Sequence, residues 1–282
     1  MSARAEPAAL ARRNWEIAKL AAFLRRDALV AWSYRTSLLS EWVMLALQAG
    51  MFYFVGRIVD PSKLPAYGGS RASYMEFAAV GIALGAFLQL SIGRVANGIR
   101  SEQMMGTLES LMMTPTAAAT VQVGTVVYDL LYIPLRTTIF LATVGIAFGL
   151  RFEPSGFLPA ALVLLAFIPF AWGLGVASAA AVATFKRGEG VAGIVVAALT
   201  LVSGAYIPLS VFPGWIADAT RYNPIALAVT GMRGPLLAGG WTGVPHALAL
   251  LAPMSAITLA TGIMLFKLAL RREHRRGTLG LY

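Results

Sequence analysis

Several residue types that carry chemistry are missing or scarce in this sequence. The 282 residues include no cysteine and only two histidines, which excludes disulfides, thiolate metal sites and cysteine nucleophiles. The histidines, His246 and His274, have no neighbours at metal-ligand spacing. None of the four lysines follows a glycine, so the G-x-x-x-x-G-K-[ST] loop that holds a nucleotide phosphate is absent too. The chain is therefore not expected to be an enzyme, to bind a metal or cofactor, or to hydrolyse ATP itself.

Charge is also scarce, and its placement is informative. Charged residues make up 13% of the chain against 58% hydrophobic residues, and the mean hydropathy is +0.70. Soluble domains carry about 25% charged residues, so the composition predicts a bilayer as solvent. The net charge of +10 does not predict nucleic-acid binding, because the basic residues collect at the ends of hydrophobic blocks rather than in a basic, aromatic-rich surface run.

The hydrophobic residues fall into blocks of the length that a membrane helix needs. A bilayer core of about 30 Å is crossed by about 20 mostly apolar residues. The third block is long enough to begin as an interfacial helix and is interrupted by Pro134, and the fifth is short. The six predicted spans are Leu38–Val59, Tyr74–Gly93, Thr120–Leu150, Phe157–Phe185, Val191–Pro208 and Val244–Leu270.

The basic residues orient these spans. With both termini in the cytoplasm, sixteen of the 23 Lys and Arg residues lie on the inner side and six on the outer side, as the positive-inside rule requires. We therefore expect an all-α protein with six spans, both ends inside, in the inner membrane of a prokaryote. The predicted domains are a cytoplasmic segment over 1–36, a membrane domain over 37–270 and a basic tail over 271–282. Within the first, residues from about Ala8 to Tyr34 predict an amphipathic helix in the headgroup plane.

A short polar segment between the second and third spans is the best-formed surface for a soluble partner. It reads IRSEQMMGTLESLMMTP from Ile99 to Pro115. Gly106 predicts a break in the helix that leaves span two, Thr107 is a good N-cap for a new short helix, and Pro115 predicts its end. Such a helix would present apolar and methionine side chains, which adapt to a partner's groove. An ordinary loop helix lying on the membrane is the alternative.

Two motifs in this sequence resemble those of type-2 ATP-binding-cassette exporter permeases. The run EQMMGTLESLMMTP from Glu102 to Pro115 is similar to the family's E…GTLE.L…P stretch. The run from Ser203 to Gly240 is similar to its SG.yfPl..lP.wl segment. The basic pair before span five and the Gly277–Leu279 triplet fit the drug and lipo-oligosaccharide branch. The resemblance covers almost the whole chain in order.

The resemblance implies partners and functional segments. Such permeases dimerise, with a second copy or a related permease, and work with two cytoplasmic ATPase subunits that bind the ATP and Mg²⁺. The segment after span two would be the coupling helix in the ATPase groove, and the segment after span five a re-entrant outer hairpin. The implied coupling residues are Glu102, Gly106, Thr107, Leu108, Glu109, Leu111, Met112 and Pro115; the implied hairpin residues are Gly204, Pro208, Pro213, Trp215 and Pro224.

Several residues inside the spans are candidates for a translocation path or for packing. The predicted path residues are Gln48, Phe52, Phe87 and Tyr206. Asp129 and Arg136 lie seven residues apart on one helical face and predict a structural pair, with a role in conformational switching or direct contact with the substrate as the alternatives. Glu41 shares a face with Gln48 and is expected near the inner headgroups. Gly81 and Gly85 form a G-x-x-x-G pair that predicts close helix packing.

The sequence thus predicts the permease subunit of an ATP-driven exporter that moves a hydrophobic or amphipathic molecule, such as a drug, natural product or lipid. Export of a lipid-linked oligosaccharide by the same machinery is the alternative, and stacked aromatic residues along the path would favour it. Two other classes remain open. A stand-alone ion-driven carrier or channel would need polar relays across several spans, and an intramembrane enzyme would need clustered acidic or histidine residues.

Overall fold

The structure is a computed structural model that describes the chain in ranges with gaps between them. These ranges are 5–60, 64–67, 70–71, 73–104, 124, 126–185 and 189–276. The predicted coupling segment from Gly106 to Pro115 lies outside the described residues, as do Lys186, Arg187 and the Gly277–Leu279 triplet. Of the predicted coupling residues, only Glu102 is placed: it lies in the last turn of helix α3.

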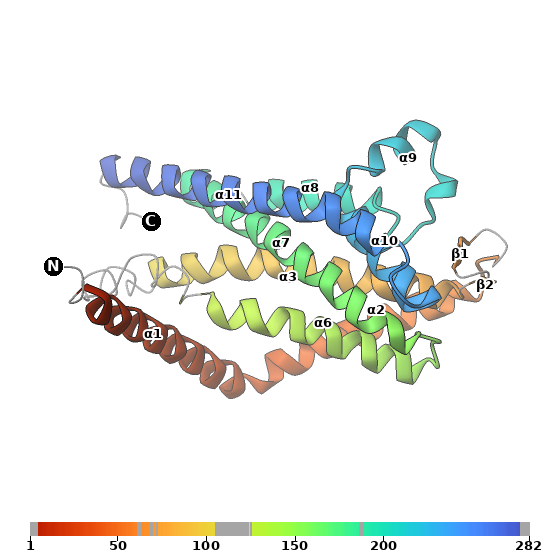
Figure 1. The fold of residues 1–282 in the computed structure, drawn as a ribbon, viewed down its shortest axis with the longest axis horizontal. Helices are drawn as coiled ribbons and strands as arrows, with labels where there is room; N and C mark the ends of the chain where they lie inside the picture. The colour runs from red at the N-terminus through yellow and green to blue at the C-terminus, as the bar shows by residue number, and fades with distance from the viewer. Residues whose placement is uncertain are drawn as a thin grey trace.

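The described chain is helical apart from one hairpin of two short strands. The helices run largely along one axis; the start of α1 and the end of α11 lie at one end, and α9 and the hairpin lie at the other (Figure 1). Strand β1 pairs antiparallel with β2. The elements are α1 (Ala5–Ser33), α2 (Arg35–Gly56), β1 (Ala66–Tyr67), β2 (Ser70–Arg71), α3 (Tyr74–Met104), α6 (Val127–Ala147), η2 (Pro154–Gly156), α7 (Phe157–Phe185), α8 (Glu189–Leu201), η3 (Leu209–Val211), α9 (Gly214–Thr220), α10 (Pro224–Ala238) and α11 (Val244–Arg276).

Five of the helices are long and apolar enough to cross a membrane. They are α2, the first part of α3 (Tyr74–Arg94), α6, the Pro154–Ala181 stretch containing η2 and α7, and Val244–Ala269 within α11. These segments agree with the first, second, third, fourth and sixth predicted spans. The predicted amphipathic helix near the N-terminus is present as α1, which runs obliquely to the long axis of the bundle and meets α2 at Tyr34 (Figure 1).

Two predicted spans differ from the observed helices. Pro134 does not interrupt the third span, because α6 continues through it; in membrane helices, neighbouring side chains re-satisfy the backbone groups that proline frees. The fifth predicted span forms a helix of only 13 residues, α8, before the backbone turns irregular at Val202. At 1.5 Å per residue this helix is about 20 Å long, which is less than a bilayer core.

Helix α3 is the centre of the bundle. It packs against α2, α6, α7, α8 and α10, and its buried face includes Phe77, Leu84 and Phe87. Beside it, α7 and α11 form the closest helix pair of the fold. A Cβ added to Gly262 would lie 2.3 Å from the Gly173 carbonyl oxygen. Glycines at this crossing therefore let two backbones touch, as small residues do between membrane helices.

Candidate functional site: a polar cavity beside an ion-pair cluster

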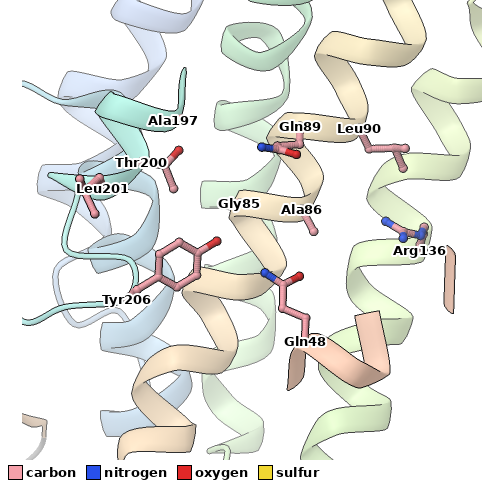
Figure 2. Close-up of a pocket in the computed structure, with 10 residues that line it drawn as sticks. All are labelled: Gln48, Gly85, Ala86, Gln89, Leu90, Arg136, Ala197, Thr200, Leu201 and Tyr206. Carbon is pink, nitrogen blue, oxygen red and sulfur yellow. The ribbon is translucent and has the colours of Figure 1, made fainter. Parts of the chain in front are cut away.

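A cavity of about 480 Å³ lies in front of α3 and between α6 and α8. Figure 2 shows α6 on one side of it and the end of α8 on the other, with α2 contributing Gln48 from below. Half of its lining is polar, which is unusual within the apolar part of a helix bundle because buried polar groups are costly unless they are hydrogen-bonded. The lining residues are Gln48, Gly85, Ala86, Gln89, Leu90, Arg136, Ala197, Thr200, Leu201 and Tyr206.

The glycine pair of α3 shapes this cavity. A Cβ on Gly85 would lie 2.4 Å from the Tyr206 hydroxyl, and one on Gly81 would lie 2.0 Å from the Ala205 carbonyl oxygen. The G-x-x-x-G pair therefore permits close packing, as predicted, but its partner is the irregular backbone after α8 rather than another helix. This close approach brings the Tyr206 ring to the cavity wall (Figure 2).

The four predicted path residues occupy different places. Gln48 and Tyr206 both line the cavity. Phe52 lies beside it and stacks on Tyr206 with ring centroids 5.2 Å apart. Phe87 points elsewhere: it is fully buried, and its ring centroid lies 5.8 Å from that of Phe167 on α7. The structure brings the first three together and separates Phe87 from them, while the role of all four in transport stays a prediction.

A cluster of ionic side chains adjoins the cavity and joins α2, α3 and α6. Its centre is Arg94, whose Nη1 donates to the Asp129 carboxylate at 3.1 Å and whose Nη2 donates to the Glu41 carboxylate. The Arg94 guanidinium also lies over the Tyr132 ring, 5.6 Å from its centroid. One cation of α3 thus holds carboxylates of two other helices, and charge-assisted hydrogen bonds of this kind are the stronger ones.

Arg136 completes the cluster with looser contacts. Its Nε lies 3.5 Å from the Glu41 carboxylate, its Nη2 donates to the Glu41 carbonyl at 3.4 Å, and its guanidinium lies 5.9 Å from the centroid of the Trp42 ring. The predicted pair of Asp129 with Arg136 is wrong, because each side chain pairs with a different partner. A shared helical face brings two residues near each other, but oppositely charged groups on the packed neighbours α2 and α3 lie closer still.

Sequence reasoning missed the role of Arg94. It counted this residue only as a basic flank of the second span. The available signal was that Glu41, Arg94 and Asp129 all fall near the predicted inner ends of three successive spans. Charged groups at the same depth in the bilayer pair when their helices pack. The expected depth of each residue therefore indicated these ion pairs, whereas helical spacing did not.

A second buried arginine organises the segment after α8. The Arg233 side chain is only 3% exposed and donates to the carbonyls of Phe77 at 2.9 Å, Gly204 at 2.7 Å and Ala205 at 2.5 Å. Its guanidinium also lies 3.6 Å from the centroid of the Phe77 ring. Buried irregular backbone needs its polar groups satisfied within the protein, and Arg233 supplies donors to three carbonyls here.

The predicted hairpin residues lie along this segment. Gly204 has a positive φ of 74°, which glycine adopts without strain. Pro208 and Pro213 precede η3 and α9, and Trp215 is exposed on α9. Pro224 is the first residue of α10, where Asn223 caps the helix by accepting from the Ile225 amide at 3.0 Å. Pro208 and Pro213 thus lie at the N-caps of two short helices, and Pro224 occupies the first helical position, which its fixed φ favours.

The described residues include no group of three or more His, Asp or Glu side chains that could hold a metal ion. The expectation that this chain binds no metal or cofactor stays a prediction.

Comparison with known proteins supplies a family. The profile described as ABC-2 type transporter matches residues 18–237. A probable doxorubicin resistance ABC transporter permease protein, DrrC, of Mycobacterium tuberculosis strain CDC 1551 / Oshkosh is 30% identical over 165 residues, and its counterpart in strain ATCC 25618 / H37Rv matches equally. The alignment covers 56% of this chain and 57% of each relative, so the chain spans a little over half the length of the curated relatives it matches.

Proposed function

Because this chain belongs to the ABC-2 type transporter family and has several membrane-length helices, we propose that it is the membrane subunit of an ATP-driven exporter. It moves a hydrophobic or amphipathic molecule outward, and a separate ABC ATPase subunit hydrolyses the ATP. The observation that carries this proposal is the family match over residues 18–237. The name of the doxorubicin-resistance relatives supports a drug or natural product as the substrate.

The topology that we propose has six crossings with both ends in the cytoplasm. Helix α8 makes the fifth crossing together with the irregular backbone from Val202 to Pro208, and η3, α9 and α10 form a re-entrant segment on the outer side. Two observations support this arrangement. The Arg233 hydrogen bonds satisfy the irregular backbone internally, and α10 is apolar but has only 15 residues. The domain boundaries proposed above, 1–36, 37–270 and 271–282, follow the same topology.

Coupling to the ATPase is assigned to the segment from Glu102 to Pro115. Helix α3 extends past its membrane-length part to Met104, so the segment continues directly from the helix that lines the cavity. A displacement of this segment by the ATPase would move α3. The ion-pair cluster would transmit this movement to α2 and α6. The coupling residues are those implied by the family resemblance, with Glu109 in the first turn of the proposed helix.

A second copy of this chain, or a related permease, completes the complex. Both α2 and α8 contribute to the cavity lining, and both helices expose large apolar side chains, including Leu47, Met51, Ile194 and Val195. Lipid can cover such faces, but a partner that does so would also close the cavity. Each permease then recruits one ATPase, and the two-fold arrangement places the path between the protomers.

Export of a lipid-linked oligosaccharide is the second candidate, and one observation favours it. Phe52 stacks on both Tyr206 and Tyr74, with ring centroids 5.2 and 6.4 Å apart. Stacked aromatics at the end of a path suit sugar rings. Of these three residues only Tyr206 lines the cavity. We therefore prefer a drug or natural product to a lipid-linked oligosaccharide as the proposed substrate.

The proposal is tested by purification in mild detergent from the native membrane, followed by transport in inside-out vesicles with doxorubicin as the probe. We expect a stoichiometric ABC ATPase to copurify and doxorubicin to accumulate only with ATP. Replacement Glu109→Arg reverses the charge of the proposed coupling helix and should lower both copurification and uptake about tenfold or more, since docking depends on complementary charge.

Glu153→Arg is the matched control, because it makes the same charge reversal at an exposed residue of the α6–α7 connection and should leave uptake intact. If the chain purifies alone and moves doxorubicin without ATP, it is a stand-alone carrier. If a well-expressed Glu109→Arg protein transports as before, the coupling segment lies elsewhere.

A further inference from the structure

The charge that faces the cavity is positive. Among the described residues that line it, Arg136 is the one with a charged side chain. The two carboxylates of the neighbouring cluster, Glu41 and Asp129, are not part of this lining. A molecule in the cavity therefore meets a guanidinium directly, whereas the compensating negative charges lie behind the wall.

The two arginines of the cluster are held differently. Arg94 donates to Asp129 at 3.1 Å and also donates to Glu41, so it engages both carboxylates. Arg136 is more deeply buried, at 6% exposure against 28% for Arg94. Its contacts with Glu41 are nevertheless long, at 3.4 and 3.5 Å, and its Nε makes no hydrogen bond to any described residue.

Burying a hydrogen-bond donor without an acceptor costs free energy. Burying an unpaired guanidinium in the apolar part of a membrane costs more. The wall around Arg136 also carries the amides of Gln48 and Gln89 and the hydroxyl of Tyr206 (Figure 2). Apolar side chains such as Leu90 and Leu201 complete the lining. This arrangement offers several hydrogen-bond donors to one polar group and an apolar surface to the rest of the same molecule.

We infer that this cavity binds an anionic amphiphile whose carboxylate or phosphate group is placed on Arg136, with its apolar body along Leu90 and Leu201. The inference rests on the proposed export function and concerns this cavity alone: doxorubicin, an amine that is cationic near neutral pH, would be transported without binding Arg136. Guanidinium groups bind oxyanions through charge-assisted hydrogen bonds, and neither a neutral nor a cationic analogue of the same body can make them equally well.

Three pyrene probes test the charge requirement directly. Pyrenebutyrate, pyrenebutanol and pyrenebutylamine share one apolar body and differ in the terminal group. Binding to the chain alone in zwitterionic lipid nanodiscs is measured by energy transfer from tryptophan; Trp42 lies beside Arg136. Comparing variants for each probe removes the contribution of partition into lipid. We expect pyrenebutyrate to bind about tenfold tighter than pyrenebutanol, and Arg136→Gln to abolish this difference.

Two further variants keep the result interpretable if Arg136→Gln folds poorly. Arg136→Lys retains the charge but lacks the planar set of guanidinium donors, and it should keep part of the preference for pyrenebutyrate over pyrenebutanol. Arg57→Gln removes an exposed cation that follows α2, lies outside the cluster and does not line the cavity, and it should leave the preference for the carboxylate probe in place. Equal binding of the carboxylate and amine probes, or equal loss in Arg57→Gln and Arg136→Gln, would overturn the inference.

The two proposals fail separately. Binding is measured without ATP or an ATPase, so a carboxylate preference in a chain that shows no ATP-dependent uptake would count against the export function alone. ATP-dependent uptake of doxorubicin with no carboxylate preference in the cavity would count against this inference alone.

Discussion

Two arginines hold the bundle in different ways: Arg94 lies on α3 after its cavity-lining residues, and Arg233 contacts α3 before them. Arg94 binds side chains: two carboxylates that belong to α2 and α6. Arg233 binds backbone: three carbonyls from α3 and from the turn after α8. The first arginine is 28% exposed and the second 3%. The same residue type thus serves a partly exposed site and a buried one.

This difference separates parts that can rearrange from parts that cannot. Carboxylate side chains have rotamers, so an ion-pair cluster can exchange partners while helices shift, and each partly exposed pair contributes little net free energy. Backbone carbonyls of a turn have no such freedom, and leaving them unpaired at membrane depth costs several kcal/mol. The Arg94 end is therefore suited to movement and the Arg233 end to a fixed shape.

The largest expected effect is at the fixed end. Arg233→Leu should lower the free energy of unfolding by about 3 kcal/mol or more, because it leaves three carbonyls without a charged donor. The measurement is an SDS titration in mixed micelles followed by near-UV circular dichroism. Arg233→Lys keeps the charge but lacks the planar set of guanidinium donors. Its free energy of unfolding should lie between those of Arg233→Leu and the wild type. A Leu variant as stable as the wild type would remove the distinction between the two ends.

A smaller effect is expected where α3 touches the same turn. Gly81→Ala places a Cβ 2.0 Å from the Ala205 carbonyl oxygen, so the turn or the helix must shift at a cost of about 1–3 kcal/mol. Gly93→Ala is the control on the same helix, since its Cβ would meet nothing within 4 Å, and it should be neutral or stabilising by up to about 1 kcal/mol. If both variants behave alike in the same titration, the close approach is not a constraint.

The smallest effect is expected at the ionic end. Asp129→Asn should cost about 1 kcal/mol, and in a double-mutant cycle with Arg94→Gln the coupling energy should be of similar size. The exposed pair of Asp218 with Arg221 on α9, at 3.1 Å, is the reference: Asp218→Asn should change stability by less than about 0.5 kcal/mol. A loss at Asp129 as large as that at Arg233 would show that the cluster is structural rather than adaptable.

Composition and hydrophobic block length were sufficient to predict the helical membrane class and five of the observed membrane-length helices. They could not predict where α8 ends, because its apolar run continues to Pro208 and the turn at Val202 is stabilised by Arg233, a distant residue. The pairing in the cluster failed for a related reason. Helical spacing relates Asp129 to Arg136 on one helix, but packing of three helices decides which charges meet.

The candidate cavity was predictable in part. Gln48 stood out as a polar residue deep in a span, and Tyr206 lay in a recognisable segment; both line it. Gln89 and Thr200 gave no separate signal, because a single polar residue in an apolar helix does not reveal which way it faces. Arg136 stood out as an ionisable residue within a span, but it was expected to pair with Asp129. Phe87 was predicted to line the path, but its side chain is packed in the core, as large aromatic side chains often are.

The contacts of Arg233 also have a consequence for the order in which the chain is made. Arg233 is synthesised 156 residues after Phe77 and 28 residues after Ala205. The start of α3 and the turn after α8 thus leave the ribosome before the residue that satisfies their carbonyls. Until α10 arrives, this region cannot take its final form within the bilayer, so the cavity is completed late in biogenesis, when most of the bundle is already inserted.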